Sequence, residues 1–240
     1  MRYLLTLTGW THTDLRELFE RAGQYRARTG AGTEGAAVMF FPPASLRTRV
    51  SFERGAAEMG LQPIVLLSET LDTDEDLVDL AGYLASWARL LVVRHKDRTV
   101  PEKLASTEAL PVINAMTAAD HPCEILSDLY ALSQATDVFG LRILFVGADG
   151  NIARAWREAD RSFGLDVRQT RPVGLRVPGM PWEEDLAIAM TAADVVITAA
   201  PGRHEGELVG LPSDGGSPRR RPRKCPVHPM PTLRERMRGG

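Results

Sequence analysis

The chain has 240 residues, of which 44% are hydrophobic and 25% are charged, and its formal net charge is −2. This is the composition of an ordinary globular protein with one large domain or two small ones. Because no apolar run approaches the roughly 20 residues that a membrane helix needs, the sequence excludes a transmembrane span. The first ten residues have too short an apolar core for a secretory signal, so we expect a cytoplasmic location.

In the first half of the chain, short apolar runs alternate with stretches of helical periodicity. The pattern predicts strands over 36–41, 63–67, 90–93 and 112–113. It predicts helices over 11–25, over 74–87 and from Pro122 onward. Such alternation is typical of a doubly wound parallel sheet.

The same alternation continues from residue 139, with strands expected over 141–146, 167–170 and 194–198 and helices over 152–163 and 182–190. We therefore expect an α/β protein of two doubly wound parallel-sheet domains, over 1–135 and 136–210, with a ligand cleft between them. Residues 211–240 are expected to form an irregular tail, with eight basic and two acidic residues. No aromatic residues interleave with these arginines, so a nucleic-acid partner is not expected.

The segment SLRTR at 45–49 is the most informative stretch, because it places hydroxyl and guanidinium groups between a predicted buried strand and a predicted helix. A helix start presents unpaired N–H groups and the positive end of the helix dipole, so Ser45, Arg47 and Thr48 could wrap a phosphate. A Ser N-cap followed by a solvated basic turn fits the same spacing equally well. Arg47 and Arg49 lie roughly 200° apart around a helix, so we expect one to bind and the other to brace.

Polar side chains also follow two further predicted strands. Arg94 follows the third strand, and His121 stands in a loop after the fourth. Because the carboxyl ends of parallel strands meet at one edge of a sheet, we expect these groups to converge with Ser45, Arg47 and Thr48. The convergence favours a phosphate site over a capped turn, and a functional His121 over a structural one.

Other motifs carry less information. The turn GADGN at 147–151 does not spell GxGxxG, which argues against a dinucleotide and favours a smaller ligand. Cys123 falls in an apolar helical stretch, which predicts a buried and inert thiol. Cys123 and Cys225 lack metal-ligand spacing, so we expect reduced thiols and no metal site.

Taken together, these motifs resemble the aspartate and ornithine carbamoyltransferases. The family's SxRTR phosphate motif is matched at 45–49, and the arginine after its third strand is matched by Arg94. Its PVIN segment stands at 111–114, its HPxQ motif is matched at 121–124 as HPCE, and a candidate HPxP element stands at 228–231.

The resemblance implies transfer of a carbamoyl group from carbamoyl phosphate to the amino group of an amino acid or related amine, by a homotrimer without cofactor or metal. It implies a carbamoyl-phosphate-binding domain over 1–135 and a shortened acceptor-binding domain over 136–210. The catalytic residues that it implies are Arg47, Thr48, Arg94 and His121. The implied carbamoyl phosphate contacts are these four with Ser45, Leu46 and Glu124. The candidate acceptor contacts are Asn151, Arg203, His228, Pro229 and Met230.

The chain departs from the family at several positions. Glu124 stands where the family has glutamine. Its carboxylate can accept a hydrogen bond from the carbamoyl NH2 but cannot donate one. It also adds negative charge beside an anionic substrate. In the aspartate enzymes the loop that corresponds to residues 70–75 supplies a lysine to a neighbouring subunit, but this loop contains no lysine here. In the ornithine enzymes an aspartate follows the last strand of the second domain, whereas this chain has Ala199 and Ala200 there. These departures leave a second interpretation open, a catalytically weak or silent subunit that binds or acts as a scaffold.

Overall fold

The computed structural model describes residues 3–170 and 174–198, together with the backbone of residues 227–229. The chain forms two compact units, Met1–Ser127 and Asp128–Gly240, which divide inside helix α5 (Pro122–Ser133). Each unit contains an open sheet whose first three strands in the chain are parallel, so the expected doubly wound α/β class is confirmed. The domain limits at 135 and 210, and the cleft between the domains, stay predictions.

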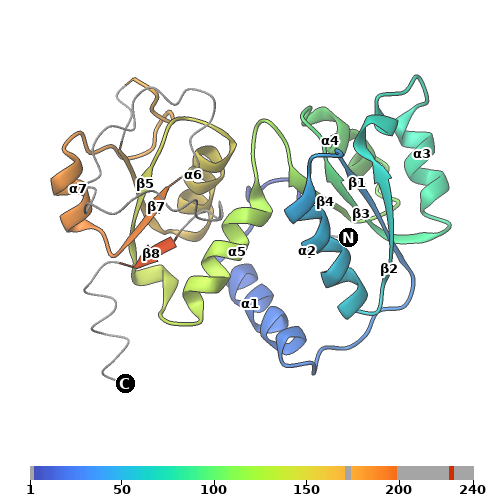
Figure 1. Ribbon diagram of the computed structural model, residues 1–240, viewed down its shortest axis with the longest axis horizontal. Coiled ribbons are helices and arrows are strands. Elements are labelled where there is room, and N and C mark those ends of the chain that lie inside the picture. Colours follow the sequence, from blue (N-terminus) through green and yellow to red (C-terminus); the bar gives the residue numbers. More distant parts are fainter. Residues whose placement is uncertain (1–2, 171–173, 199–226, 230–240) are drawn as a thin grey trace, which may run out of the picture. The chain divides into compact units, whose positions relative to one another are not determined.

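The first unit is built on a four-stranded parallel sheet with the order β2-β1-β3-β4 (Figure 1). Its strands are β1 (Ala36–Phe41), β2 (Gln62–Leu67), β3 (Ala88–Arg94) and β4 (Val112–Met116). From β1 the chain adds β2 on one side and β3 on the other, so the strand order reverses between β1 and β3. Open α/β sheets bind ligands at the carboxyl ends of the strands at such a switch point. The topology therefore points to the residues that follow β1 and β3.

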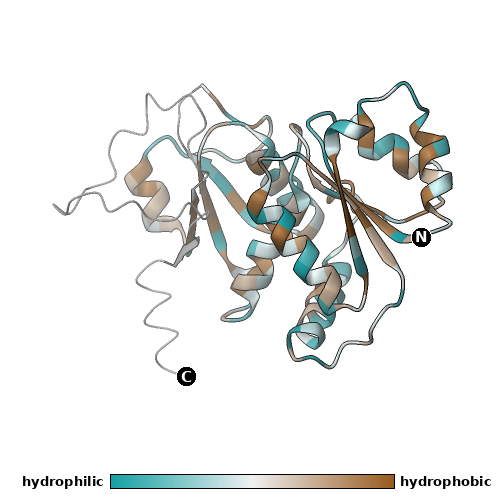
Figure 2. Ribbon diagram, turned by 45° about the vertical axis from the view of Figure 1, so that its right-hand side comes forward, coloured by the Kyte–Doolittle hydropathy of each residue, from teal (hydrophilic) through white to brown (hydrophobic). Residues whose placement is uncertain are grey.

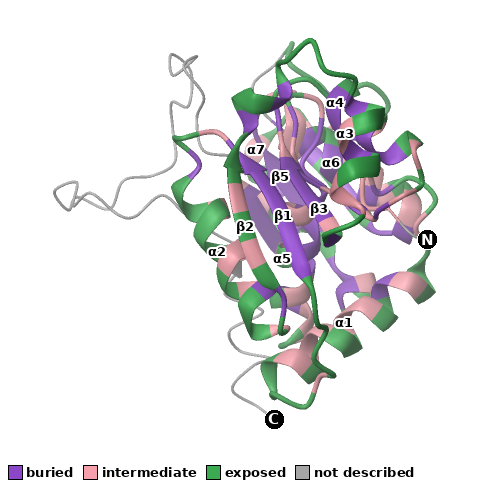
Figure 3. Ribbon diagram, turned by 90° about the vertical axis from the view of Figure 1, so that its right-hand side faces the viewer, coloured by how far each residue is buried: buried purple, intermediate pink, exposed green. Residues whose placement is uncertain are grey.

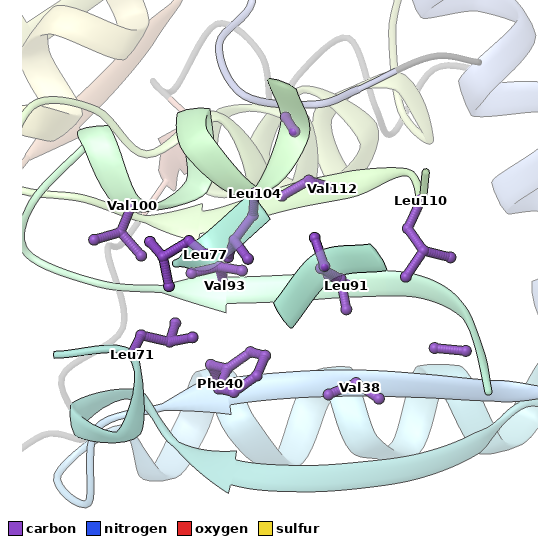
Figure 4. Packing of buried hydrophobic residues seen from close by; sticks show 13 residues of the cluster. Val38, Phe40, Leu71, Leu77, Leu91, Val93, Val100, Leu104, Leu110 and Val112 are labelled. Atoms are coloured by element: carbon purple, nitrogen blue, oxygen red, sulfur yellow. The ribbon is translucent and has the colours of Figure 1, made fainter. Parts of the chain in front are cut away.

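Strand β1 is buried along its whole length because side chains pack on both faces of the sheet (Figure 3). Val38 and Phe40 belong to a cluster with residues of β3 and of two helices (Figure 4). On the other face, Met39 and Phe41 belong to a second cluster, in which the ring centroids of Phe41 and Phe52 lie 5.9 Å apart. The uninterrupted apolar sequence of β1 follows from this two-sided burial.

The helices of the first unit are α1 (His12–Arg26), α2 (Leu46–Glu58), α3 (Leu77–Leu84), α4 (Thr99–Ser106) and α5, with a short 3-10 helix η1 (Ser68–Leu71). Helix α3 is shorter than the predicted 74–87 because the Asp76 side chain accepts from the Val78 N–H and caps the helix start. Helix α4 is not among the predicted elements. Its Pro101 falls in the first turn, where the missing N–H costs no helical hydrogen bond.

The sheet of the second unit has the order β6-β5-β7-β8. Its strands are β5 (Arg142–Val146), β6 (Asp166–Thr170), β7 (Val195–Thr198) and β8 (Val227–Pro229). Strand β8 pairs antiparallel with β7, so the expectation of an irregular tail over 211–240 is wrong at 227–229, where the backbone completes the edge of the sheet. The remainder of that tail lies outside the described residues.

The helices of the second unit are α6 (Asn151–Phe163) and α7 (Leu186–Ala192), with a 3-10 helix η2 (Val138–Gly140). The helix predicted from Trp182 begins only at Leu186. Asp185 caps it by accepting from two backbone N–H groups, and Trp182 instead forms a β-bridge with Gln169. Local capping therefore overrides the apolar periodicity at this helix start.

Hydrophobic residues concentrate along the strands, whereas the helices alternate between hydrophobic and hydrophilic residues (Figure 2). This alternation is typical of helices that pack one face on a sheet. Within the ranges that the structure describes, no helix is both long and apolar enough to cross a membrane.

Candidate active site

Ser45 lies directly after β1, at the start of α2, and its hydroxyl is buried without a hydrogen-bond partner among the described residues. The residue is 4% exposed, and its side chain makes no capping bond to the helix. Ser45 thus holds the N-cap position of α2, but its hydroxyl does not cap the helix as the alternative interpretation expects. A buried hydroxyl without a partner costs free energy, and such groups in native proteins usually have a ligand or an ordered water.

The first turn of α2 adds positive charge to this position and no negative charge. Arg47 is exposed there, Thr48 is partly buried, and the turn contains no acidic residue. The first backbone N–H groups of a helix have no carbonyl partner within it, and the helix dipole places partial positive charge at the same point. The turn thus offers amide, hydroxyl and guanidinium donors to an anion.

Arg94, the last residue of β3, joins this turn directly. Its Nη1 donates to Thr48 Oγ1 at 2.8 Å, across 46 positions of sequence. Burial lowers the pKa of the Arg94 guanidinium below its ordinary value; the charge of Arg47 lowers it further, and the carboxylate of Glu124 opposes the change. Arg94 is thus a partly desolvated cation, and an anion beside it would restore the electrostatic stabilisation lost on burial.

The loop that carries His121 is fixed by a network of hydrogen bonds around Asp120. Asn114 Nδ2 donates to Asp120 Oδ1 and also to the carbonyl of Leu5, the latter at 2.8 Å. The Asp120 N–H donates to Thr117 Oγ1 at 3.2 Å, and the Thr117 N–H donates to the Asp120 carbonyl at 2.9 Å. These bonds tie the loop to the end of β4, so the position of His121 is set by buried neighbours.

His121 itself is 7% exposed, and its Nδ1 has no hydrogen-bond partner among the described residues. Burial lowers the pKa of the imidazole to about 4, and the positive charge of Arg94 adds to the effect. Glu124 Oε2 lies 3.6 Å from His121 Nε2 and would favour the charged ring, but burial and Arg94 outweigh it. His121 is therefore neutral at physiological pH, and a neutral imidazole can donate one hydrogen bond.

Glu124 lies on the first turn of α5, beside His121 and in the electrostatic field of Arg94. Its side chain is 37% exposed, whereas that of His121 is 9% exposed. A separation of 3.6 Å is too long for a hydrogen bond, so the carboxylate is close to the imidazole without being bonded to it.

Arg49 Nε donates to Glu53 Oε1 at 2.5 Å, so Arg49 braces the helix, as expected for one of the two arginines. The binding role of Arg47 stays a prediction. Burial raises the pKa of the Cys123 thiol to about 12, with added contributions from Glu124 and Asp120. The raised pKa keeps the thiol of the partly buried Cys123 protonated and unreactive at neutral pH, and its Sγ contacts the Asn114 carbonyl at 3.3 Å. Leu46, by contrast, is 71% exposed.

The residues expected to contact the acceptor are placed less completely. Asn151 begins α6, and its Oδ1 accepts from the Ile152 N–H at 2.9 Å. His228 and Pro229 lie in the backbone of β8, and their side chains are outside the described part of the chain. Arg203 and Met230 lie outside the described residues altogether, as does Cys225.

The structure brings Ser45, Arg47, Thr48, Arg94, His121 and Glu124 together within the first unit. The sequence does not assign a supporting role to Asn114, Thr117 and Asp120. Asn114 lies within β4 and Asp120 directly precedes His121, and no pattern in the sequence indicates that these two side chains bond to each other. In the described residues, no group of three or more His, Cys, Asp or Glu side chains could hold a metal ion.

Comparison with known proteins agrees with this arrangement. Residues 2–134 match the family model described as "Aspartate/ornithine carbamoyltransferase, carbamoyl-P binding domain". The ornithine carbamoyltransferase of Geobacter sulfurreducens is 30% identical over 210 residues, which are 84% of this chain and 69% of that protein. The solved structure of the ornithine carbamoyltransferase from Pyrococcus furiosus matches with a TM-score of 0.76 and 26% identity, over 86% of this chain and 74% of that one. The chain is thus a member of the aspartate/ornithine carbamoyltransferase family.

Proposed function

We propose that the site in the first unit binds carbamoyl phosphate and transfers its carbamoyl group to an amino-group acceptor. The observation that carries the proposal is the buried Ser45 hydroxyl, which has no partner in the described part of the chain, at the start of a helix whose first turn supplies Arg47 and Thr48. A phosphate at this position would accept from the hydroxyl, the first-turn amides and the Arg47 guanidinium.

The carbonyl oxygen of the carbamoyl group would face Arg94, Thr48 and His121. Arg94 and the neutral His121 donate to the oxyanion as it forms on that oxygen, and the low solvent exposure of His121 strengthens the interaction. The uncharged amine attacks the carbamoyl carbon, the new C–N bond forms, and the C–O bond to phosphate breaks. The amine loses one proton, which leaves on the phosphate, so the products are a ureido compound and hydrogen phosphate.

Ornithine is the first acceptor to test, because the relatives named above are ornithine carbamoyltransferases. Asn151 at the start of α6 is the proposed acceptor contact among the described residues. Purified protein would be incubated with carbamoyl phosphate and ornithine, aspartate, other amino acids or polyamines, and ureido product and phosphate would be measured. We expect product with at least one acceptor, whereas no product with any of them at high enzyme concentration would refute the proposal.

The paired variants Arg47→Ala and Arg49→Ala test the site itself. We expect Arg47→Ala to lower kcat/KM by about a hundredfold, the order found when one preorganised donor is removed. Arg49→Ala removes an exposed ion pair of the same helix, so kcat/KM should change by less than about threefold. Equal losses in both variants would contradict the assignment of Arg47 to the phosphate.

We further propose that the chain works as a homotrimer in the cytoplasm. The support in the structure is the exposure of large apolar side chains on the first unit, which a monomer would leave in water: Leu46 and Val50 of α2, and Ile64, Leu66 and Leu67 of the edge strand β2. Sedimentation should give a mass of about three times 26.3 kDa for the wild type and a smaller mass for Val50→Glu. A monomeric wild type at micromolar concentration would exclude the trimer.

A further inference from the structure

We propose that Glu124 makes the site distinguish carbamoyl phosphate from inorganic phosphate, the product that would otherwise compete for the same donors. The inference rests on the proposed function, because it assigns a selectivity to the same site. It concerns the carboxylate of Glu124, the last residue of the HPCE segment at 121–124.

The geometry gives the site two chemically different ends. The start of α2 is the end that binds anions, with the Ser45 hydroxyl and the Arg47 guanidinium. The start of α5 contributes the opposite charge, with the Glu124 carboxylate 3.6 Å from His121 Nε2. Arg94 links the two ends, because it donates to Thr48 at 2.8 Å and lies within the field of Glu124.

A ligand that fills both ends must present an anion to α2 and a hydrogen-bond donor to α5. Carbamoyl phosphate does so, since its NH2 group can donate to the Glu124 carboxylate while its phosphate occupies the α2 turn. A hydrogen bond to an ionised acceptor is roughly twice as strong as one to a neutral acceptor. The charge-assisted bond therefore offsets the repulsion between the carboxylate and the phosphate.

Inorganic phosphate cannot fill both ends of the site. It carries negative charge to the α2 turn, but it has no second group that extends from there to the carboxylate at the other end. When it is held at the α2 turn, it experiences the repulsion of Glu124 without the compensating bond that the carbamoyl NH2 makes. A glutamine at this position would accept from the carbamoyl NH2 as well, but it would not repel free phosphate. The carboxylate thus weakens product binding selectively.

The carboxylate is available for this role. Its side chain is 37% exposed, and its distance from His121 leaves it outside hydrogen-bonding range of the imidazole. An acidic residue in the first turn of a helix is also favoured by the helix dipole, so α5 tolerates the charge at this position.

The test compares Glu124→Gln with the wild type by calorimetric titration of inorganic phosphate and by the KM for carbamoyl phosphate. We expect phosphate to bind on the order of tenfold tighter in the variant, as removal of one unit charge within a partly desolvated site predicts. The KM for carbamoyl phosphate should change by less than about threefold, because the lost repulsion and the weakened hydrogen bond oppose each other. Higher salt should reduce the difference in phosphate affinity.

Glu58→Gln is the matched control, because it removes the same charge from an exposed ion pair with Arg54 on the last turn of α2. It should leave the affinity for phosphate within about twofold of the wild type. The inference is overturned if Glu124→Gln leaves phosphate affinity unchanged, or if it tightens phosphate and carbamoyl phosphate by the same factor. Failure of the proposed function looks different, because the wild type would then neither bind carbamoyl phosphate nor form a ureido product.

Discussion

The two units place a helix start after their central strands in the same way, yet the two starts differ in how their polar groups are satisfied. At the first, after β1, the Ser45 hydroxyl has no partner among the described residues, and the nearby His121 Nδ1 also has none there. At the second, after β5, the Asp149 carboxylate accepts from Arg154 Nε and Nη2 at 2.8 and 3.0 Å.

The loops beside the second helix start are also held by hydrogen bonds within the unit. The buried Gln169 side chain donates to the Gly147 and Leu175 carbonyls and accepts from the Val177 N–H, so the loops around the turn are held by internal bonds. A doubly wound topology thus supplies a helix start in each unit, and the two starts differ in the residue that faces the turn. The proposed anion site is assigned to the first start because the Ser45 hydroxyl there has no partner among the described residues, whereas the Asp149 carboxylate at the second start is paired.

The largest loss of activity is expected from a substitution of Arg94, which links the α2 turn with His121 and Glu124. We expect Arg94→Gln to lower kcat/KM by about a thousandfold, because a donor to the developing oxyanion and the anchor of Thr48 are lost together. Arg89→Gln, at the exposed opposite end of the same strand, is the control and should stay within about threefold. If Arg94→Gln keeps more than a tenth of the wild-type kcat/KM, Arg94 does not donate to the developing oxyanion.

The second prediction concerns the loop that positions His121. Asp120→Ala removes a buried carboxylate that accepts from Asn114 Nδ2 and from the Thr117 hydroxyl, so the free energy of unfolding should fall by about 2–3 kcal/mol in urea denaturation. Asp120→Asn keeps an acceptor oxygen, so its free energy of unfolding should fall by less than that of Asp120→Ala. If Asp120→Ala loses no stability, the hydrogen-bond network does not hold the loop.

The third prediction uses the low pKa of His121. A histidine whose folded pKa is about 4 and whose unfolded pKa is 6.5 stabilises the fold fully above pH 6.5, and the contribution is lost as the pH falls toward 4. Between pH 7 and pH 5 the wild type should lose about 2 kcal/mol from this residue. In His121→Gln the loss of stability over the same interval should be smaller by that amount. Parallel pH profiles for the two proteins would show that His121 is not held neutral by burial.

Much of the first unit could be predicted because its sequence signals are local and agree with one another. The apolar run of β1 is long enough for a strand and bounded by Pro42 and Pro43, and Pro122 opens a helix whose Ile125 and Leu129 are fully buried. The convergence of Ser45, Arg94 and His121 also follows from topology alone, since parallel strands end at one edge.

The remaining features depend on contacts between distant residues. The neutral state of His121 requires its burial and the approach of Arg94, which lies 27 positions earlier in the chain. The Asn114–Asp120 network cannot be inferred from spacing, because it depends on how one loop folds back on β4. Strand β8 is too short for periodicity to reveal, and its backbone pairs with β7, which lies about 30 positions earlier in the chain.

The smallest expected effect tests the second helix start. Asp149→Asn weakens a surface pair whose side chains are 27% and 48% exposed, so stability should change by less than about 1 kcal/mol. Phosphate affinity should stay within about twofold, because the proposed phosphate site lies at the first start. The KM for the acceptor should change more than the KM for carbamoyl phosphate, since Asn151 lies two residues away. A change in phosphate affinity as large as that of Arg47→Ala would mean that both helix starts bind the anion.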